Sequence, residues 1–214
     1  LIKKYNSKKN TEISILETAC GTWVVAKEFV KKWFDVTWLD ISEKMLEVAK
    51  NNLSAEKLVL ADMTDFNLNK KFDVVLCNYN SICHLTDWTL WQKYFEMAYK
   101  HLDNWRIFIF DINTLFEFEN ITKDFAQFYN FQDDTVCLEM FKKDWIYEWL
   151  VKMFQKREDW TYDLVEEIVR ENSFPIHMIK KELKNKWFKV TEILDFHYWE
   201  VNSESERVYF VCEK

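Results

Sequence analysis

The chain has 214 residues, of which 49% are hydrophobic and 30% are charged, and its formal net charge is -7. A chain of this length and composition can bury one fair-sized core without disulfide or metal staples. The acidic balance argues against a nucleic-acid surface, which needs clustered Lys and Arg, and no apolar run is long enough to span a membrane.

Cysteine usage predicts the compartment. Five cysteines are scattered through apolar segments, and no signal peptide is visible. We therefore expect reduced thiols and a cytoplasmic protein. The chain opens with Leu1 instead of Met, so two alternatives stay open: an N-terminal part is missing, or it never existed.

Glycine and tryptophan occur in unusual numbers. The chain has 1 glycine and 11 tryptophans, whereas average usage would give about 15 glycines. Five tryptophans stand where a helix end, a hairpin turn or a strand entry usually has glycine; they are Trp33, Trp105, Trp145, Trp160 and Trp187. A bulky residue in left-handed backbone costs about 1–2 kcal/mol. Two explanations stay open: these positions adopt conformations that tryptophan tolerates, or the sequence differs there from the one that evolved.

The first half of the chain alternates buried strands with amphipathic helices. Apolar runs predict strands over residues 13–16, 35–40, 58–61, 72–78 and 107–111. Helices are expected after residue 23, after the N-cap Ser42 and after an N-cap at Thr86 or Asp87. Strict alternation of this kind predicts right-handed crossovers and a parallel sheet covered on both faces.

The pattern changes after Asn113. Residues 136–141, 145–156 and 162–171 read as strands of an antiparallel ribbon with one solvated face. A helix then starts at Pro175, and residues 188–196 and 207–211 supply two last strands. We therefore expect a main domain of residues 1–123 and 174–214, with an antiparallel insertion of residues 124–173.

Three of the predicted strands end at an acidic residue, and these residues are Glu17, Asp40 and Asp62. The carboxyl ends of parallel strands meet at one edge of a sheet, which is where such sheets bind ligands. The loop around Gly21 lets backbone N–H groups approach a ligand, and an acid about twenty residues further on can hold ribose hydroxyls. The pattern is typical of a nucleotide-type site.

These motifs resemble one known family. Residues 16–22, Leu-Glu-Thr-Ala-Cys-Gly-Thr, resemble the first motif of the class I S-adenosylmethionine (SAM) dependent methyltransferases. Residues 37–46 resemble the second strand and following helix of that family. The resemblance covers most of the chain except the insertion, but Trp23 replaces the last motif glycine and Trp38 a second one. It implies a Rossmann-like, doubly wound α/β fold with a seven-stranded, mostly parallel sheet, an antiparallel last strand and a small antiparallel β insertion.

The resemblance also implies a cofactor, SAM, and the residues around it. In the family the first acid and its loop hold the methionine moiety, the second acid holds the ribose, the next Asp-hydrophobe pair reads the adenine, and residues after the fourth strand face the methyl group. The residues so implied are Glu17, Ala19, Cys20, Gly21, Thr22, Trp23, Asp40, Ile41, Met45, Asp62, Met63, Asn78 and Tyr79. Met45 and Met63 suit a plain core position equally well, and an indole at Trp23 is expected to weaken or abolish SAM binding.

Two residues are candidates for the acceptor side. His84 lies beyond the fourth strand, where these enzymes place substrate contacts, and it suits either a general base or a structural histidine. Asn113 follows the fifth strand. Cys77, Cys83 and His84 match no standard zinc spacing, so no metal is expected.

The first hypothesis is a methyltransferase that acts on a small molecule. The nitrogen or oxygen nature of the acceptor stays open. The resemblance is closest to small methyltransferases with an antiparallel lid between the fifth strand and the last helix, several of which act on amines or amino sugars. A second hypothesis is a binding or structural protein on the same fold, impaired by the loss of loop glycines. A third is a nicotinamide-dependent oxidoreductase, against which the Asp62-Met63 pair and the antiparallel last strand argue. No nucleic-acid or membrane partner is expected.

Overall fold

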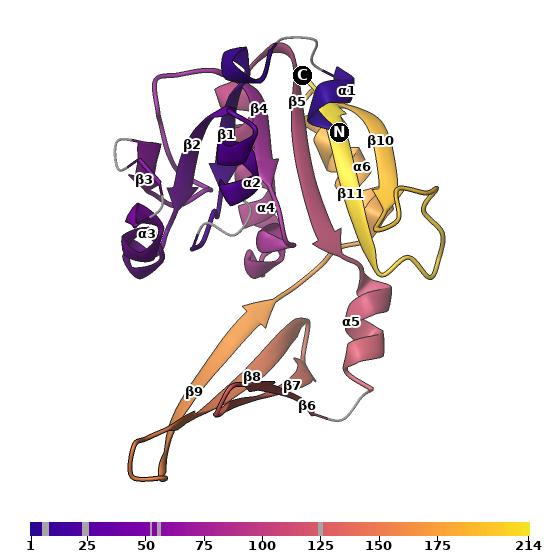
Figure 1. Ribbon diagram of the computed structural model, residues 1–214. Helices are drawn as coiled ribbons and strands as arrows, with labels where there is room; N and C mark the ends of the chain where they lie inside the picture. The colour runs from indigo at the N-terminus through magenta and orange to yellow at the C-terminus, as the bar shows by residue number, and fades with distance from the viewer. Residues whose placement is uncertain (6–8, 23–25, 52, 55–56, 124–125) are drawn as a thin grey trace.

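A seven-stranded sheet forms the body of the protein (Figure 1). The computed structural model describes residues 1–5, 9–22, 26–51, 53–54, 57–123 and 126–214. The sheet order is β10-β11-β5-β4-β1-β2-β3, in which β1 to β5 run parallel and β11 runs antiparallel to both of its neighbours. The strands are β1 (Ser14–Thr18), β2 (Asp35–Asp40), β3 (Leu58–Leu60), β4 (Phe72–Cys77), β5 (Leu102–Asn113), β10 (Lys189–Asp195) and β11 (Arg207–Glu213). The predicted Rossmann-like fold with an antiparallel last strand is confirmed.

Helices connect the strands of this sheet. Ser42 accepts a hydrogen bond from the Met45 amide at the start of α3, and Asp87 accepts one from the Thr89 amide at the start of α4, so both N-cap predictions are confirmed. The helical elements are α1 (Ile2–Tyr5), η1 (Asn10–Glu12), α2 (Ala26–Lys31), α3 (Glu43–Lys50), η3 (Ser81–His84), α4 (Trp88–His101), α5 (Leu115–Ile121) and α6 (Ile176–Asn185).

The sheet separates two hydrophobic layers. Alternate residues of a strand point to opposite faces. In β1, Leu16 therefore joins the layer that contains Trp91 of α4 and Leu183 of α6, whereas Ile15 joins the layer that contains Leu46 of α3. Every residue of β4 is buried. Because both faces are covered, polar groups on the central strands can reach a ligand only at the strand ends.

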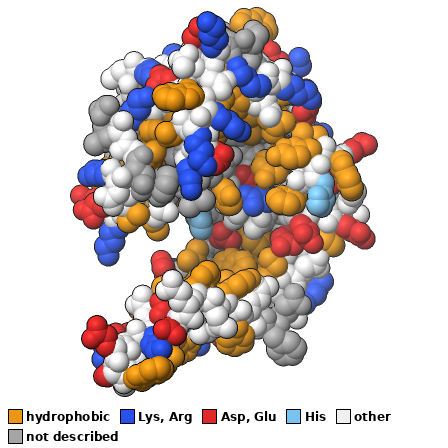
Figure 2. All heavy atoms as spheres, viewed as in Figure 1, with side chains coloured by type: hydrophobic (Ala, Val, Ile, Leu, Met, Phe, Trp, Pro, Cys, Tyr) orange, Lys and Arg blue, Asp and Glu red, His pale blue; other side chains and the backbone are white. Residues whose placement is uncertain are grey.

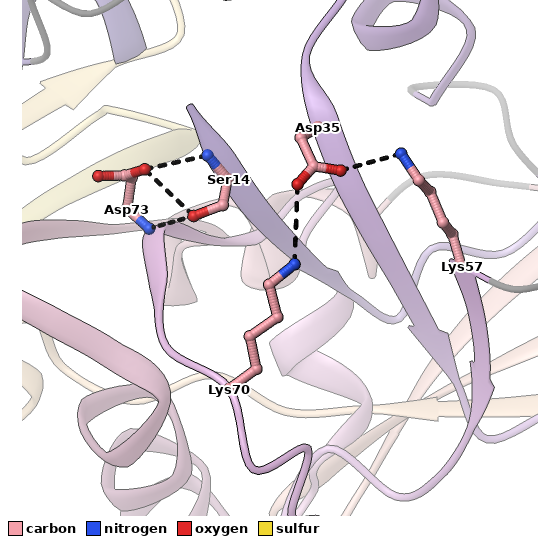
Figure 3. Close-up of polar contacts among 5 residues, drawn as sticks. All are labelled: Ser14, Asp35, Lys57, Lys70 and Asp73. Carbon is pink, nitrogen blue, oxygen red and sulfur yellow. Dashed lines mark hydrogen bonds and ion pairs between the residues drawn. The ribbon is translucent and has the colours of Figure 1, made fainter. Parts of the chain in front are cut away.

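Acids at the amino ends of the strands are paired within the protein (Figure 3). Asp73 Oδ2 accepts hydrogen bonds from the Ser14 amide at 3.0 Å and from the Ser14 hydroxyl at 3.1 Å. Asp35 carries Lys57 at 2.9 Å on one carboxylate oxygen and Lys70 at 3.7 Å on the other. These two acids are therefore paired without a ligand.

A four-stranded antiparallel sheet lies beyond the carboxyl ends of the parallel strands (Figure 1). It consists of β6 (Gln127–Phe131), β7 (Asp134–Lys143), β8 (Ile146–Lys156) and β9 (Tyr162–Glu171). Tyr147 of β8 is buried and stacks on Phe118 of α5, with 4.6 Å between the ring centroids. The predicted antiparallel ribbon is confirmed. Helix α5 was not predicted, although Thr114 caps it by accepting from the Glu117 amide, the Thr-x-x-Glu pattern of a helix start.

Four of the five tryptophans that stand where glycine is usual have left-handed backbone. The φ angles are 60° at Trp33, 60° at Trp105, 68° at Trp160 and 63° at Trp187. Trp145 is not among the residues with positive φ; Asp144 before it takes that conformation, with φ 55°. The glycine-like geometry is thus confirmed at four positions and wrong at Trp145, because the hairpin turn places the preceding residue in the left-handed region.

Candidate active site

Sheet register brings the predicted site residues to one edge. Glu17 near the end of β1 pairs with Trp38 of β2 on one side and with Leu76 of β4 on the other. Asp40 is the last residue of β2 and pairs with Leu60 of β3. The strand tips that carry the predicted acids are therefore neighbours, and they face the side on which the four-stranded sheet lies (Figure 1).

Glu17 is a buried acid with a free oxygen. Its residue is only 2% exposed, and its Oε1 accepts from Asn78 Nδ2 at 3.4 Å. Its Oε2 has no hydrogen-bond partner among the described residues. Burial raises the pKa of Glu17 to about 7, and the side chains of Asn78 and Trp38 partly oppose this shift. A buried, unpartnered carboxylate oxygen costs free energy, so this atom marks a place for a polar or cationic ligand group.

The loop after β1 is shaped by two left-handed residues, Ala19 with φ 53° and Gly21 with φ 60°. The Gly21 amide donates to Asp40 Oδ2 at 2.7 Å, and the Cys20 amide donates to the Leu39 carbonyl at 3.1 Å. A Cβ on Gly21 would meet no described atom within 4 Å. The loop therefore borders open space, and Thr22 beside it is half-buried.

The loop contains two further residues of the predicted site, Trp23 and Cys20. Trp23 lies outside the described residues. Cys20 is buried, and burial together with the charges of Asp40 and Glu17 raises the pKa of its thiol. Cys20 is therefore a protonated thiol that contributes shape to the loop instead of nucleophilic chemistry.

Asp40 fixes the backbone around it. Its Oδ2 holds the Gly21 amide, and its Oδ1 accepts from the Ser42 amide at 2.8 Å. Each carboxylate oxygen keeps a second lone pair for a ligand hydroxyl. The apolar side chains of Ile41, which is 70% exposed, and of Met45 are left open to solvent nearby. Met45 was also considered as a core residue of α3, and that alternative is wrong, because Leu46 and Ala49 fill the inner side.

The residues after β3 divide between surface and core. Asp62 is exposed, and its Oδ1 accepts from the Thr64 amide at 2.7 Å and from the Thr64 hydroxyl at 2.8 Å. Met63 is buried in the layer that contains Phe66. Asp62 is thus available to a ligand, whereas the Met63 side chain belongs to the core, so only its backbone can serve a ligand.

A cavity of about 320 Å³ opens beside the tips of β4, β5 and β11. The predicted residues Asn78 and Tyr79 line it, and Tyr79 has left-handed backbone with φ 57°. Its wall is mainly aromatic and includes two acids and one arginine; the lining residues are Glu28, Phe29, Asn78, Tyr79, Asp111, Phe196, Tyr198, Arg207 and Tyr209.

Asp111 is the central acid of this cavity. It is 0% exposed, and its Oδ2 accepts from the Asn80 amide at 2.7 Å and from Arg207 Nε at 2.7 Å. Its Oδ1 has no hydrogen-bond partner among the described residues. Burial raises the pKa of Asp111, and Arg207 opposes that shift. Sequence reasoning missed Asp111, although it ends the strand predicted over residues 107–111 in the same way that Asp40 ends its own.

His84 and Asn113 are not among the described residues that line this cavity. His84 lies in η3 with a half-exposed side chain, and its Nε2 is 3.7 Å from Glu171 Oε1. Asn113 pairs with Arg207 in the sheet. Figure 2 shows a hollow between the body and the four-stranded sheet, with hydrophobic and acidic side chains in its walls.

The described residues contain no cluster of His, Cys, Asp and Glu that could hold a metal ion. All five cysteines are buried and free. In the part of the chain that the structure covers, no helix has the length and apolar character needed to cross a membrane.

Comparisons with known proteins find methyltransferases. Residues 15–104 match the family described as a methyltransferase domain. The chain is 26% identical over 207 residues to a putative methyltransferase of Geobacillus sp., with 94% of this chain and 84% of that protein covered. It is 38% identical over 72 residues, 34% of this chain and 30% of that protein, to a dTDP-3-amino-3,4,6-trideoxy-alpha-D-glucopyranose N,N-dimethyltransferase of Streptomyces venezuelae. The fold matches a SAM-dependent methyltransferase of Clostridium acetobutylicum with a TM-score of 0.85 and 23% identity, covering 95% of this chain and 85% of that one.

The match to a methyltransferase domain over residues 15–104, together with the fold shared with SAM-dependent methyltransferases, supports a SAM-dependent methyltransferase with SAM as the cofactor. Bound SAM supplies an electrophilic methyl group on a sulfonium centre. The site fits this group, because Glu17 Oε2 has no hydrogen-bond partner among the described residues where a cationic ligand group would satisfy it, and Ile41 leaves an apolar surface beside Asp40.

A first prediction concerns the pH dependence that Glu17 imposes on the ligand-free protein. Its pKa is raised to about 7 in the folded state, so the stability that its neutral form provides is present at low pH and is lost as the pH rises towards and through 7. Glu17→Gln removes this loss and is expected to raise the free energy of unfolding at pH 8 by about 3 kcal/mol, with little change below pH 4.5. Urea denaturation across this range measures the effect.

The control is Glu47→Gln on the exposed side of α3, which should leave the pH profile unchanged. An unfolding free energy of Glu17→Gln that follows the parent chain at every pH would show that Glu17 is not held in an unfavourable charged state.

Proposed function

We propose that the protein methylates an amine nitrogen on a small, polar acceptor of the amino-sugar type. The observation that carries the proposal is the buried Asp111 carboxylate in an aromatic-lined cavity, one oxygen of which has no hydrogen-bond partner among the residues that the structure describes. Asn78 joins this cavity to the cofactor side, because it lines the cavity and donates to Glu17. The similarity to the amino-sugar N,N-dimethyltransferase of Streptomyces venezuelae supports the same acceptor class.

The cavity chemistry suits a sugar that carries an amine. Aromatic rings such as Tyr79 and Tyr209 offer flat apolar surfaces to the C–H faces of a sugar and attract cations through their π electrons. The free oxygen of Asp111 can accept a hydrogen bond from an amine or a hydroxyl. Arg207 lies 5.1 Å from the centre of the Tyr79 ring and holds Asp111 in place.

Methyl transfer is an in-line displacement, so the protein acts mainly by alignment and by exclusion of water. Asn78 and Tyr79 stand between the cofactor side and the cavity and would align the acceptor nitrogen. We assign His84 as the group that takes the proton released by the amine, because its ring is half-exposed and its Nε2 faces a carboxylate. Asn113, next to Thr114 and opposite Arg207 in the sheet, is assigned a supporting polar contact.

The remaining roles follow the family pattern. Glu17 and residues 19–23 would hold the methionine moiety of SAM, Asp40 with Ile41 and Met45 the ribose and adenine, and Asp62 and Met63 the adenine edge. We also propose that residues 124–173 act as a lid inserted into one domain formed by residues 1–123 and 174–214.

The alternatives are weaker. An impaired SAM-fold protein would follow if Trp23 blocks the cofactor loop, and that residue lies outside the described residues. The match to a methyltransferase domain supports SAM and gives a nicotinamide-dependent oxidoreductase no support.

The test is a matched acceptor panel with SAM, in which nucleotide-linked amino sugars are compared with the same sugars carrying a hydroxyl at the amine position. Product mass and release of S-adenosylhomocysteine are measured for the chain and for Trp23→Gly. We expect methylation of the amino sugars alone. Asp111→Asn should raise the acceptor KM by about tenfold or more, because the free oxygen is lost or misdirected. Methylation of the hydroxyl sugars, or of no sugar by either chain, would refute the proposal.

A further inference from the structure

Glu171 is a buried acid that joins the four-stranded sheet to the loop after β4. It is the last residue of β9 and is only 5% exposed. Its Oε1 accepts from Asn80 Nδ2 at 2.9 Å, and its Oε2 accepts from Trp149 Nε1 at 2.8 Å. His84 Nε2 lies 3.7 Å from Oε1. One carboxylate thus contacts β8 within its own sheet and two residues of the loop.

Only a carboxylate satisfies both N–H donors at this position. Each oxygen of Glu171 accepts from one side-chain N–H group. A glutamine has a single carbonyl oxygen, so its NH₂ group would face either Asn80 Nδ2 or Trp149 Nε1, donor against donor. In a buried site one unsatisfied donor pair is costly.

The loop that Glu171 contacts is backbone-strained. Tyr79 and Asn80 have φ angles of 57° and 47°, in the left-handed region. Asn80 is held from two directions, since its amide N–H donates to Asp111 Oδ2 at 2.7 Å and its side chain donates to Glu171. Next to Glu171, the Asn172 amide donates to the Cys83 carbonyl at 2.8 Å. The end of β9 is therefore held against the loop of residues 78–84 by hydrogen bonds at two positions, Glu171 and Asn172.

We infer that Glu171 is a positioning residue for methyl transfer: through Asn80 and His84 it makes the loop of residues 78–84 adopt its working conformation only while the four-stranded sheet is docked. The inference rests on the proposed function in that it takes this loop as the acceptor side of the site. Sequence reasoning missed Glu171. An acid at the end of a solvated strand gives no sign of a hydrogen bond with Asn80, which lies 91 residues earlier in the chain.

The test compares Glu171→Gln, Asn80→Gly, the double variant and Trp149→Phe. Asn80→Gly keeps the left-handed backbone and removes the amide, whereas Trp149→Phe removes only the hydrogen bond inside the four-stranded sheet. Amide hydrogen exchange of residues 78–86 is the primary measurement. Glu171→Gln and Asn80→Gly should each speed exchange about tenfold, with a double variant no faster than the faster single one, since coupled residues are not additive. Trp149→Phe should leave the loop protected.

Turnover with the accepted amino sugar gives a second measurement, in which Glu171→Gln should lower kcat about tenfold while the SAM dissociation constant changes less than about twofold. Equal loop protection in Glu171→Gln and the parent chain, or loss of protection in Trp149→Phe to the same extent, would overturn the inference. Hydrogen exchange decides this point even if no amino sugar is methylated, in which case the proposed function alone fails.

A second, independent observation concerns the left-handed tryptophans. Trp33 and Trp187 each follow a helix, and the backbone around them forms a helix-ending motif in which glycine is strongly preferred. The Trp33 amide donates to Val30 O at 3.0 Å and the Phe34 amide to Phe29 O at 3.2 Å. The Trp187 amide donates to Lys184 O at 3.0 Å and the Phe188 amide to Leu183 O at 2.9 Å.

The indoles at these positions stay in solvent. The tryptophans at positions 33, 105, 160 and 187 are between 75% and 78% exposed. By contrast, Trp91 is fully buried and donates from Nε1 to the Leu85 carbonyl at 2.6 Å. The exposed set thus combines a conformation that favours glycine with a large side chain left in solvent. We propose that the natural protein carries glycine at positions 33, 105, 160 and 187.

Peptide mass spectrometry of the protein isolated from the organism that makes it tests this proposal, and glycine at the four positions is the expected result. Independently, the variant with all four tryptophans replaced by glycine should melt about 10 °C higher than the chain as given, since each left-handed tryptophan is strained. The matched control replaces the exposed Trp145 and Trp199, which lack positive φ, and should not gain stability. Tryptophan in the native peptides, or no gain in the fourfold variant, would overturn the proposal.

Discussion

The structure depends on the cost of burying carboxylates at the carboxyl ends of parallel strands. Both faces of the seven-stranded sheet are covered, so its central strands offer polar groups only at their ends. At the amino ends the acids are paired internally, as Asp35 is with Lys57. At the carboxyl ends Glu17 and Asp111 each keep a buried oxygen without a partner among the described residues. This difference between paired acids at the amino ends and carboxylate oxygens without a described partner at the carboxyl ends indicates that ligands bind at the carboxyl ends.

The same constraint organises the loops. Asp40 uses both of its oxygens to hold backbone amides on either side of it, which fixes the first loop before any cofactor arrives. Asp111 accepts from the backbone amide of Asn80, and Glu171 accepts from the side-chain amide of the same residue. Preorganisation of this kind lowers the conformational cost of binding. The four-stranded sheet is part of this arrangement, since its last strand supplies one of the two acids that hold Asn80.

Most of the fold could be predicted from the chain because local signals agree with the tertiary structure. Apolar runs predicted the central strands, and Ser42 and Asp87 predicted two helix starts from their capping chemistry. Helix α5 was not predicted because its apolar face is short, although Thr114 is a recognisable N-cap residue. The turn at Trp145 was misjudged because a hairpin can place the left-handed residue one position earlier.

The site was predictable to the extent that each residue ends a strand. Glu17, Asp40 and Asn78 could be found by this rule, and Asp111 obeys it as well. Glu171 could not be found, because its partners Asn80 and Trp149 are brought to it only by the packing of the two sheets. Met63 shows the opposite limit, since its position in the sequence fits an adenine contact while its side chain packs in the core.

The most direct measurement of the central claim is calorimetric titration of SAM into three proteins: the chain as given, Trp23→Gly, and Trp23→Gly combined with Asp40→Ala. The account predicts that Trp23→Gly binds SAM with one site per chain and more tightly than the chain with Trp23. Adding Asp40→Ala should weaken this binding about tenfold or more, because it removes the acid that orders the loop and that is assigned to the ribose. Absence of binding by both the chain and Trp23→Gly, or binding that does not respond to Asp40→Ala, would contradict it.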